Sequence, residues 1–217
     1  LGNWQHRGTV PKEKGFRLSE PKILFTEKDI EQYHVSLSYP GITVNNSDLY
    51  PMLIMNNLLG GGMSSRLFQN IREERGLAYS VYSYPSTYLS TGMYSIYAAT
   101  RPEQCEKVIN IILNEIQLLI NKGFTYEEFH IAKEQLKGNY ILSNETTGSR
   151  MNAIGKAKTL LDKVLTPDQI LEKINKVQPE DVREVIKKTF CNQNVYAALV
   201  GSEDKTNKIW RLINKGV

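Results

Sequence analysis

The stretch LGGGMSSRLFQNIREERGLAYSVYS, from Leu59 to Ser83, decides the fold because it joins a glycine loop, a short helix, a glycine stop and a tyrosine-rich strand. The run Gly60-Gly61-Gly62 predicts backbone conformations that are closed to other residues. Apolar side chains then recur at helical spacing, at Leu67, Phe68 and Ile71. Gly76 follows where a left-handed residue can end that helix. We therefore expect the chain to reverse direction at Gly76 and to continue as a strand.

We expect this reversal to bring two side chains close together. Arg72 lies near the end of the helix and Tyr79 at the start of the strand, so a guanidinium with five donors meets a phenol. Such a pair beside a glycine loop suits a peptide carbonyl or an oxyanion. The residues alone also allow a simpler interpretation, in which Arg72 pairs with a nearby glutamate and Tyr79 lies in the core. Strict alternation would place Tyr79 on the same face as Val81 and Ser83.

The composition indicates a globular protein with a sizeable core, since hydrophobic residues make up 41% and charged residues 23% of the 217 residues. The net charge of +4 is spread over scattered lysines, so we expect no nucleic acid as a partner. No apolar run reaches about 18 residues, so we expect no membrane contact through a spanning helix. Cys105 and Cys191 stand far apart without a CxxC motif, which indicates reduced thiols in a reducing compartment, with a single disulfide as the alternative.

The chain divides into two parts. Residues 1–20 are charged and punctuated by Gly and Pro, and we interpret them as the tail of a preceding domain with a linker, whereas residues 21–217 form one domain. Strands are predicted at 22–26, 31–39, 79–84, 92–100 and 194–200. Because the early strands follow one another and helices then run consecutively, we predict an α+β fold. It has a mostly antiparallel β-sheet, with strands paired mostly with their sequence neighbours and several helices packed on one face.

One helix of that layer is predicted from about Ser149 onward. Its apolar side chains recur at helical spacing and are expected to point inward: Met151, Ile154, Ala157 and Leu161.

The sequence carries no recognisable catalytic centre of its own. Its three histidines, His6, His34 and His130, form neither HExxH nor HxxEH, so we expect no metal ligands in this chain. The chain also lacks GxSxG, and neither cysteine has a histidine nearby, so a nucleophilic triad is not indicated. The glycine loop is not a P-loop, because GxxxxGK[ST] is absent.

The central stretch closely resembles the second-half domain of the pitrilysin/insulinase family of zinc metallopeptidases, in particular its processing-peptidase branch. The resemblance extends in order over about residues 21–201, and LGNW at the start resembles the end of the family's first half. It is carried by EQYHVSLSYPG at 31–41, TGMYSIYAATRPE at 91–103, TYEEFHIAKEQLKGNYILSNE at 125–145 and TPDQILEKINKVQPEDV at 166–182.

The resemblance implies a specific division of labour. Family members pair two homologous halves into a clam-like chamber, and the first half binds zinc through an inverted HxxEH motif and a distal glutamate. The second half supplies an Arg and a Tyr in R-x6-Y spacing, which match Arg72 and Tyr79 here. The resemblance implies that Arg72 holds a backbone carbonyl of the substrate and that Tyr79 is catalytic, reaching the scissile carbonyl as its oxyanion develops. It also implies that Gly60, Gly61 and Gly62 contribute to substrate binding.

The chain departs from an active peptidase because it has no HxxEH, so alone it is expected to be inactive and to hold no zinc. We expect a C-terminal, non-zinc-binding half of a zinc metalloendopeptidase, a hydrolase of the inverzincin type, that closes the chamber over a peptide substrate. Its partner is a homologous N-terminal half on the same or a separate chain, in a homodimer or a heterodimer. Two alternatives stay open: a non-catalytic structural subunit of a respiratory complex, and a free-standing peptide-binding module. The expected location is the cytoplasm of a bacterium, or the mitochondrial matrix in a eukaryote.

Overall fold

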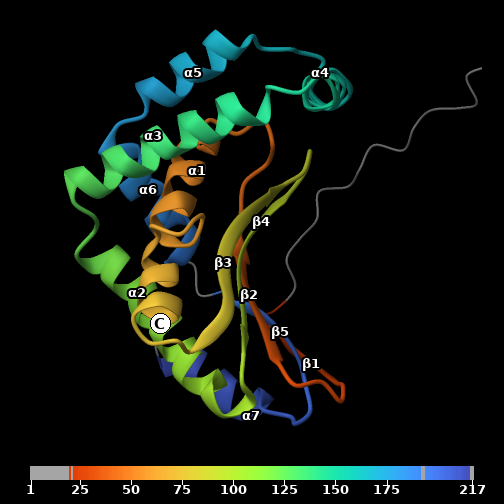
Figure 1. Ribbon diagram of the computed structural model, residues 1–217, viewed down its shortest axis with the longest axis vertical. Coiled ribbons are helices and arrows are strands. Elements are labelled where there is room, and N and C mark those ends of the chain that lie inside the picture. Colours follow the sequence, from red (N-terminus) through yellow and green to blue (C-terminus); the bar gives the residue numbers. More distant parts are fainter. Residues whose placement is uncertain (1–19, 21, 192–193, 216–217) are drawn as a thin grey trace, which may run out of the picture.

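The computed structural model describes residues 20, 22–191 and 194–215, which form one five-stranded sheet and a layer of helices (Figure 1). The strands are β1 (Ile23–Glu27), β2 (Tyr33–Pro40), β3 (Ala78–Thr87), β4 (Gly92–Thr100) and β5 (Tyr196–Gly201). Their order across the sheet is β1-β5-β2-β4-β3, so β3 forms one edge. The predicted tail and linker at 1–20 lie outside the described residues except for Glu20.

The pairing confirms a mostly antiparallel sheet, with one exception. The pairs β3–β4, β2–β4 and β2–β5 are antiparallel, whereas β1 and β5 are parallel. The expectation that the first two strands pair with each other is wrong, because β5 lies between them. The sequence of β5, YAALVG, has no charged side chain of the kind that protects an edge strand. β5 is therefore paired on both sides: Leu199 pairs with Val35 of β2 on one side and with Phe25 of β1 on the other.

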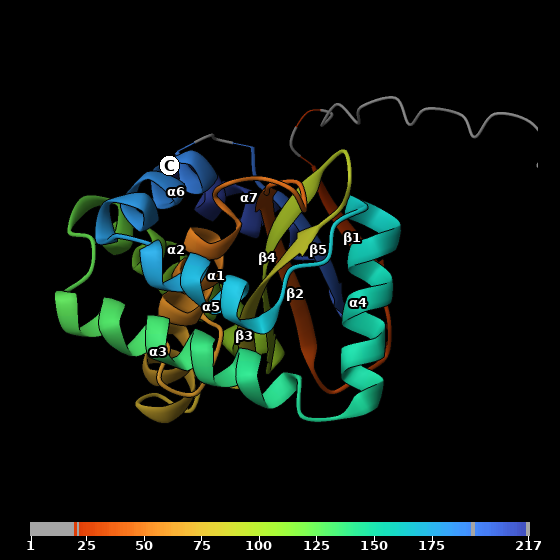
Figure 2. The ribbon, with the colours of Figure 1, turned by 90° about the horizontal axis from the view of Figure 1, so that it is seen from above.

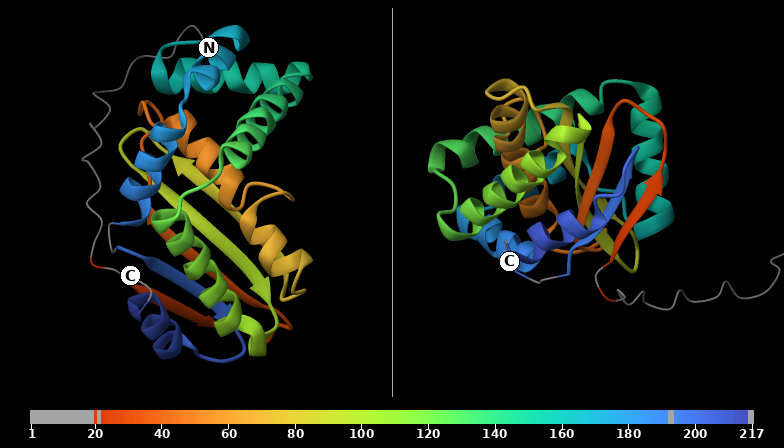
Figure 3. Two further views of the ribbon diagram at one scale, coloured as in Figure 1. Left: turned by 90° about the vertical axis from the view of Figure 1, so that its left-hand side faces the viewer. Right: turned by 90° about the horizontal axis from the view of Figure 1, so that it is seen from below.

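The helices of the described chain lie mostly on one face of the sheet, as the α+β prediction requires, with one exception. They are α1 (Leu49–Leu59), α2 (Cys105–Asn121), α3 (Tyr126–Ser143), α4 (Thr147–Leu161), α5 (Pro167–Lys176), α6 (Pro179–Phe190) and α7 (Thr206–Lys215), with short turns η1 (Phe68–Glu73) and η2 (Pro102–Gln104). Figure 3 shows α1 and α2 lying across the strands, and α3 packs against α1. α7 packs against α2 and β1 at the other end of the sheet.

The core lies between the sheet and this helix layer. Alternate residues of β2 face it: Tyr33, Val35, Leu37 and Tyr39 are all buried, as the alternation predicted. The apolar stripe of α2 meets them, and Val108, Ile109 and Ile112 are fully buried. Cys105 is buried at the start of α2 and Cys191 is exposed, and both are free thiols.

The helix α4 departs from the prediction. It lies on the side of the sheet opposite to α1 (Figure 2), and none of its residues is buried. Met151 is 67% exposed and Ile154 is 53% exposed, so the stripe that was expected to point inward has no core to meet in the described chain. Helical spacing identifies an apolar stripe correctly, but it does not say which surface will cover that stripe.

Candidate functional site

The glycine run at the end of α1 is required for close approach and not for a left-handed backbone, which corrects the prediction. Among the described glycines, positive φ occurs at Gly76 and Gly123, whereas Gly60 has φ −154°. A Cβ at Gly60 would lie 2.6 Å from Ser83 Oγ, and a Cβ at Gly61 would lie 2.7 Å from Asn56 Nδ2. The loop therefore runs directly against β3 and the last turn of α1.

The predicted helix after this loop forms as a π-helix, and Gly76 ends it as expected. The Glu74 N–H donates to the Gln69 carbonyl at 2.9 Å, a wide turn that is found frequently at functional sites. Gly76 has φ +56°, and its N–H donates to the Arg72 carbonyl at 3.1 Å. That bond is the 5→1 bond of an αL cap, and the Leu77 N–H also donates to the Ile71 carbonyl at 2.9 Å. The cap reverses the chain between the helix and β3.

A β-bulge turns Tyr79 out of the sheet, and the predicted face of this side chain is therefore wrong. Ala78 pairs with Thr100 and Ser80 with Ala99, so Tyr79 is the extra residue of β3. Val81 and Ser83 are buried as expected, but Tyr79 is 71% exposed and does not share their face. Strict alternation fails here because one inserted residue shifts every position before it to the opposite face.

The reversal and the bulge bring Arg72 and Tyr79 together. The Arg72 guanidinium carbon lies 5.7 Å from the centre of the Tyr79 ring and 5.0 Å from the centre of the Phe68 ring. Both distances are within the range of cation–π contacts. Within the described chain, no carboxylate forms an ion pair with Arg72, and Glu74 pairs instead with Arg75 at 3.0 Å. The simpler interpretation, with Arg72 paired to a glutamate and Tyr79 in the core, therefore does not hold.

The other polar side chains of this segment are used to anchor it. Arg66 binds Glu128 of α3 at 2.8 Å and donates to the Gly123 carbonyl at 3.0 Å. Burial acts to raise the pKa of Glu128, but hydrogen bonds from the Thr125 backbone N–H and from Arg66 leave it below its usual range. Thr125 and Glu128 also form a capping box at the start of α3. Arg72 is thus left available on a segment that is tied to the helix layer.

A second anchor joins the π-helix to α2. The Asn70 Nδ2 donates to the buried Glu115 at 2.9 Å. Burial raises the pKa of Glu115, because a carboxylate loses hydration there.

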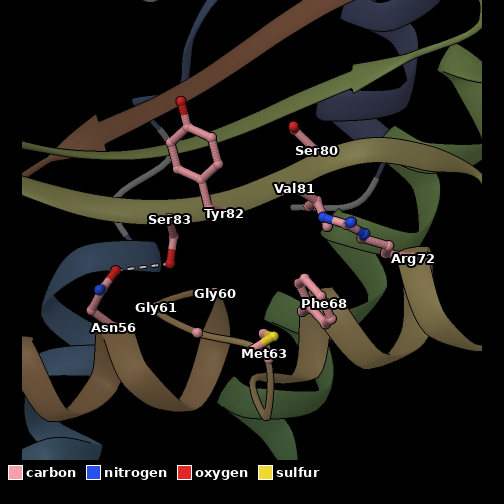
Figure 4. Close-up of a pocket in the computed structure, with 11 residues that line it drawn as sticks. Asn56, Gly60, Gly61, Met63, Phe68, Arg72, Ser80, Val81, Tyr82 and Ser83 are labelled. Atoms are coloured by element: carbon pink, nitrogen blue, oxygen red, sulfur yellow. Dashed lines mark hydrogen bonds between the residues drawn. The ribbon is translucent and has the colours of Figure 1, made fainter.

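A groove of about 380 Å³ lies between this segment and the edge strand β3 (Figure 4). Such a volume is within the range of small-ligand and peptide side-chain sites, about 300–1,000 Å³. Figure 4 shows Arg72 reaching from the helix toward Val81 at one end, and Asn56 facing Ser83 at the other. The lining residues are Asn56, Gly60, Gly61, Gly62, Met63, Phe68, Arg72, Ser80, Val81, Tyr82 and Ser83.

The predicted site residues therefore fall on one groove, although they do so in different ways. Arg72 and the three glycines line it, whereas Tyr79 is not among the lining residues and lies next to Arg72. Phe68, which supports Arg72, was not predicted, although its i, i+4 spacing to Arg72 is a readable signal. The contact of Asn56 with Ser83 was not predicted either, because it joins residues far apart in the sequence and has no local signal.

Metal-binding side chains do not gather in the part of the chain that the structure describes, where no group of three or more His, Cys, Asp or Glu could hold an ion. His34 Nδ1 is hydrogen-bonded to the Tyr97 hydroxyl at 2.6 Å, and the His130 ring stacks on the Tyr126 ring. His6 lies outside the described residues. The described residues also include no helix that is long and apolar enough to cross a membrane.

Comparison with known proteins identifies sequence relatives. The family model described as "Peptidase M16 inactive domain" matches residues 1–136. An uncharacterized zinc protease of Bacillus subtilis is 38% identical over 192 residues, which cover 87% of this chain and 47% of that protein. An uncharacterized zinc protease of Streptomyces coelicolor is 43% identical over 175 residues, which cover 81% of this chain and 38% of that protein. The chain thus spans less than half of the length of these relatives.

Solved structures share the fold at low sequence identity. A peptidase M16 inactive domain from Pseudomonas fluorescens superimposes with a TM-score of 0.78 and 21% identity over 90% of this chain and 46% of that one. A chain of complex III2 from Candida albicans gives a TM-score of 0.76 with 16% identity over 89% of this chain and 49% of that one. These likenesses confirm the α+β class, and the family match and the relatives together show that this chain belongs to the peptidase M16 family, as its inactive type of domain.

Proposed function

We propose that this chain is the C-terminal, non-zinc-binding half of a zinc-dependent endopeptidase, and that it completes an active site carried by an N-terminal half. In this role Arg72 holds a backbone carbonyl of the peptide, and the Tyr79 hydroxyl donates to the oxyanion that develops on the scissile carbonyl. The glycine loop of residues 60–62 keeps the groove open for the substrate backbone.

One observation carries this proposal. Arg72 and Tyr79 stand together at an open groove, 5.7 Å apart from guanidinium carbon to ring centre, and Tyr79 is 71% exposed. A large aromatic side chain turned outward by a bulge, next to an arginine without a carboxylate partner in the described chain, is poorly explained by stability alone. Both groups are hydrogen-bond donors that a substrate oxygen can accept from.

A homologous N-terminal half is the partner that we propose for the uncovered apolar surfaces. Met151 and Ile154 of α4 are exposed, and the sheet face turned away from α1 leaves Leu24 66% and Met93 40% exposed. Exposed apolar surface of this extent is typical of an interface. The relatives, which are more than twice as long as the segment they share with this chain, have room for such a half.

Zinc belongs to the other half in this proposal. The described residues supply no set of ligands that fits the ion, so no step here is routed through a metal bound to this chain. The contribution of this chain is to position the peptide and to offer hydrogen bonds that strengthen in the transition state.

The test is kinetic and uses the full-length protein, or the complex of both halves, with a peptide substrate. Arg72→Ala and Tyr79→Phe are each expected to lower kcat/KM by about tenfold to a thousandfold. Arg75→Ala is the matched control, because Arg75 lies in the same segment but pairs with Glu74 and does not line the groove. Its kcat/KM is expected to stay within about twofold of the wild-type value.

Two other outcomes would favour other functions. Unchanged turnover in both site variants would contradict the site and favour a structural subunit, a role compatible with the fold likeness to a chain of complex III2. Peptide affinity in the absence of any N-terminal half, measured by calorimetry, would instead favour a free-standing peptide-binding module.

A further inference from the structure

A relay of hydroxyl groups ends on Asn56, at the end of the groove away from Arg72 (Figure 4). The Tyr94 hydroxyl is fully buried and donates to Ser83 Oγ at 2.8 Å. Ser83, which is also buried, donates onward to Asn56 Oδ1 at 2.8 Å. Buried hydroxyl protons need acceptors, so this relay decides which side of the Asn56 amide faces inward.

The relay leaves the other side of that amide unused. Asn56 Oδ1 accepts from Ser83 and lies 3.2 Å from the Tyr94 hydroxyl, so Nδ2 keeps its two protons for a different partner. Within the described chain, no acceptor is hydrogen-bonded to Asn56 Nδ2, although Asn56 lines the groove and is only half-buried. A donor held in one orientation beside an open groove is arranged to meet a ligand.

The glycine loop leaves room for Asn56 and Ser83 beside it. A Cβ at Gly61 would lie 2.7 Å from Asn56 Nδ2, and a Cβ at Gly60 would lie 2.6 Å from Ser83 Oγ. Any side chain at Gly61 would therefore press on the amide donor, and one at Gly60 would press on the hydroxyl that orients it. Close approach to Ser83 and Asn56 therefore explains why residues 60 and 61 are glycines, which their backbone angles do not explain.

We infer that Asn56 Nδ2 donates a hydrogen bond to a backbone carbonyl of a peptide in the groove, at the end opposite Arg72. The inference rests on the proposed function, because it requires a peptide in this groove. A carbonyl suits a neutral amide donor, whereas a carboxylate would be drawn to Arg72, the one charged side chain of the lining. Asn56 and Arg72 would then hold two carbonyls of one extended segment.

The test uses the full-length protein and a peptide substrate with single thioamide replacements, since a thioamide sulfur accepts hydrogen bonds more weakly than oxygen. Asn56→Asp keeps an acceptor for Ser83 and Tyr94 but removes the donors, and it is expected to lower kcat/KM about tenfold to a hundredfold. Gly61→Ala is expected to lower it in the same direction. Asn110→Asp on the exposed face of α2, away from the groove and from α4, is the control for the added charge, with kcat/KM unchanged.

The thioamide series separates a direct contact from a structural effect. At one substrate position, the thioamide is expected to lower kcat/KM in the wild type and to have no further effect in Asn56→Asp. The inference is overturned if Asn56→Asp and Gly61→Ala cleave the peptide as the wild type does, or if every thioamide effect persists in Asn56→Asp. A loss of activity in Arg72→Ala alongside either result would leave the proposed function intact, whereas no loss would remove the proposed function itself. Circular dichroism of each variant checks that it folds. If Asn56→Asp does not fold, the kcat/KM of Gly61→Ala tests the inference instead.

Discussion

Replacing Gly76 by alanine should destabilise the protein although the new methyl group has room. No atom lies within 4 Å of the position that a Cβ would take at Gly76, so the cost comes from the backbone alone. With φ at +56°, an L-residue pays about 1–2 kcal/mol relative to its preferred conformations. A change of this size lowers the Tm by about 2–4 °C per kcal/mol for a domain of this length.

The matched control is Gly138→Ala, which should have the opposite sign. Gly138 lies in α3, and a Cβ there also meets nothing within 4 Å. Its φ is not positive, so alanine fits the helix and should stabilise the protein by about 0.5–1 kcal/mol. Urea unfolding of both variants, followed by circular dichroism, measures the two changes in free energy. A Gly76→Ala variant as stable as the wild type would refute the assignment of a left-handed αL cap at Gly76, between Arg72 and Tyr79.

Three further predictions follow from other contacts. Phe68→Ala should lower kcat/KM about threefold to tenfold, because the Arg72 guanidinium loses the aromatic ring whose centre lies 5.0 Å away. Phe68→Tyr, which keeps a ring, should retain activity. Equal losses of kcat/KM in both variants would contradict a cation–π contact that supports Arg72. Glu115→Gln should raise the free energy of unfolding at pH 7 but not near pH 4, as urea titrations would measure. Burial raises the pKa of Glu115, so folding favours the protonated form and wild-type stability falls as the pH rises above its unfolded pKa; a variant that loses more stability at pH 7 than at pH 4 would oppose this. Ile154→Asp on α4 should change the free energy of unfolding of this domain by less than about 0.5 kcal/mol, because Ile154 is exposed. The same variant should weaken the association of this domain with the N-terminal half, measured by sedimentation. Unchanged association would count against α4 as an interface.

Local signals predicted the central segment well. The glycine stop, the strand after it and the meeting of Arg72 with Tyr79 depend on neighbours in the sequence, and the structure has all three. The capping box at Thr125 is equally local and is present. Features of this kind are set by backbone sterics and by hydrogen bonds within a few residues, which the sequence displays directly.

Features that depend on distant parts of the chain were not predictable in the same way. The position of β5 between β1 and β2 depends on how strands from distant parts of the chain pair. The alternation of apolar residues within a strand indicates which face is buried, but it does not indicate which strands are neighbours. The bulge at Tyr79 reverses a face through a single unpaired residue. The reason for Gly60 and Gly61 lies in Ser83 and Asn56, and it becomes visible only when β3 is packed against the loop.

The measurement that tests the account most directly is the effect of Tyr79→Phe on kcat and KM separately, in the full-length protein with a peptide substrate and with Tyr88→Phe as the exposed control. If the Tyr79 hydroxyl donates to the developing oxyanion, kcat should fall about tenfold to a thousandfold while KM stays nearly constant. A rise in KM with unchanged kcat, or no change in either constant, would contradict the claim that this domain takes part in the chemical step.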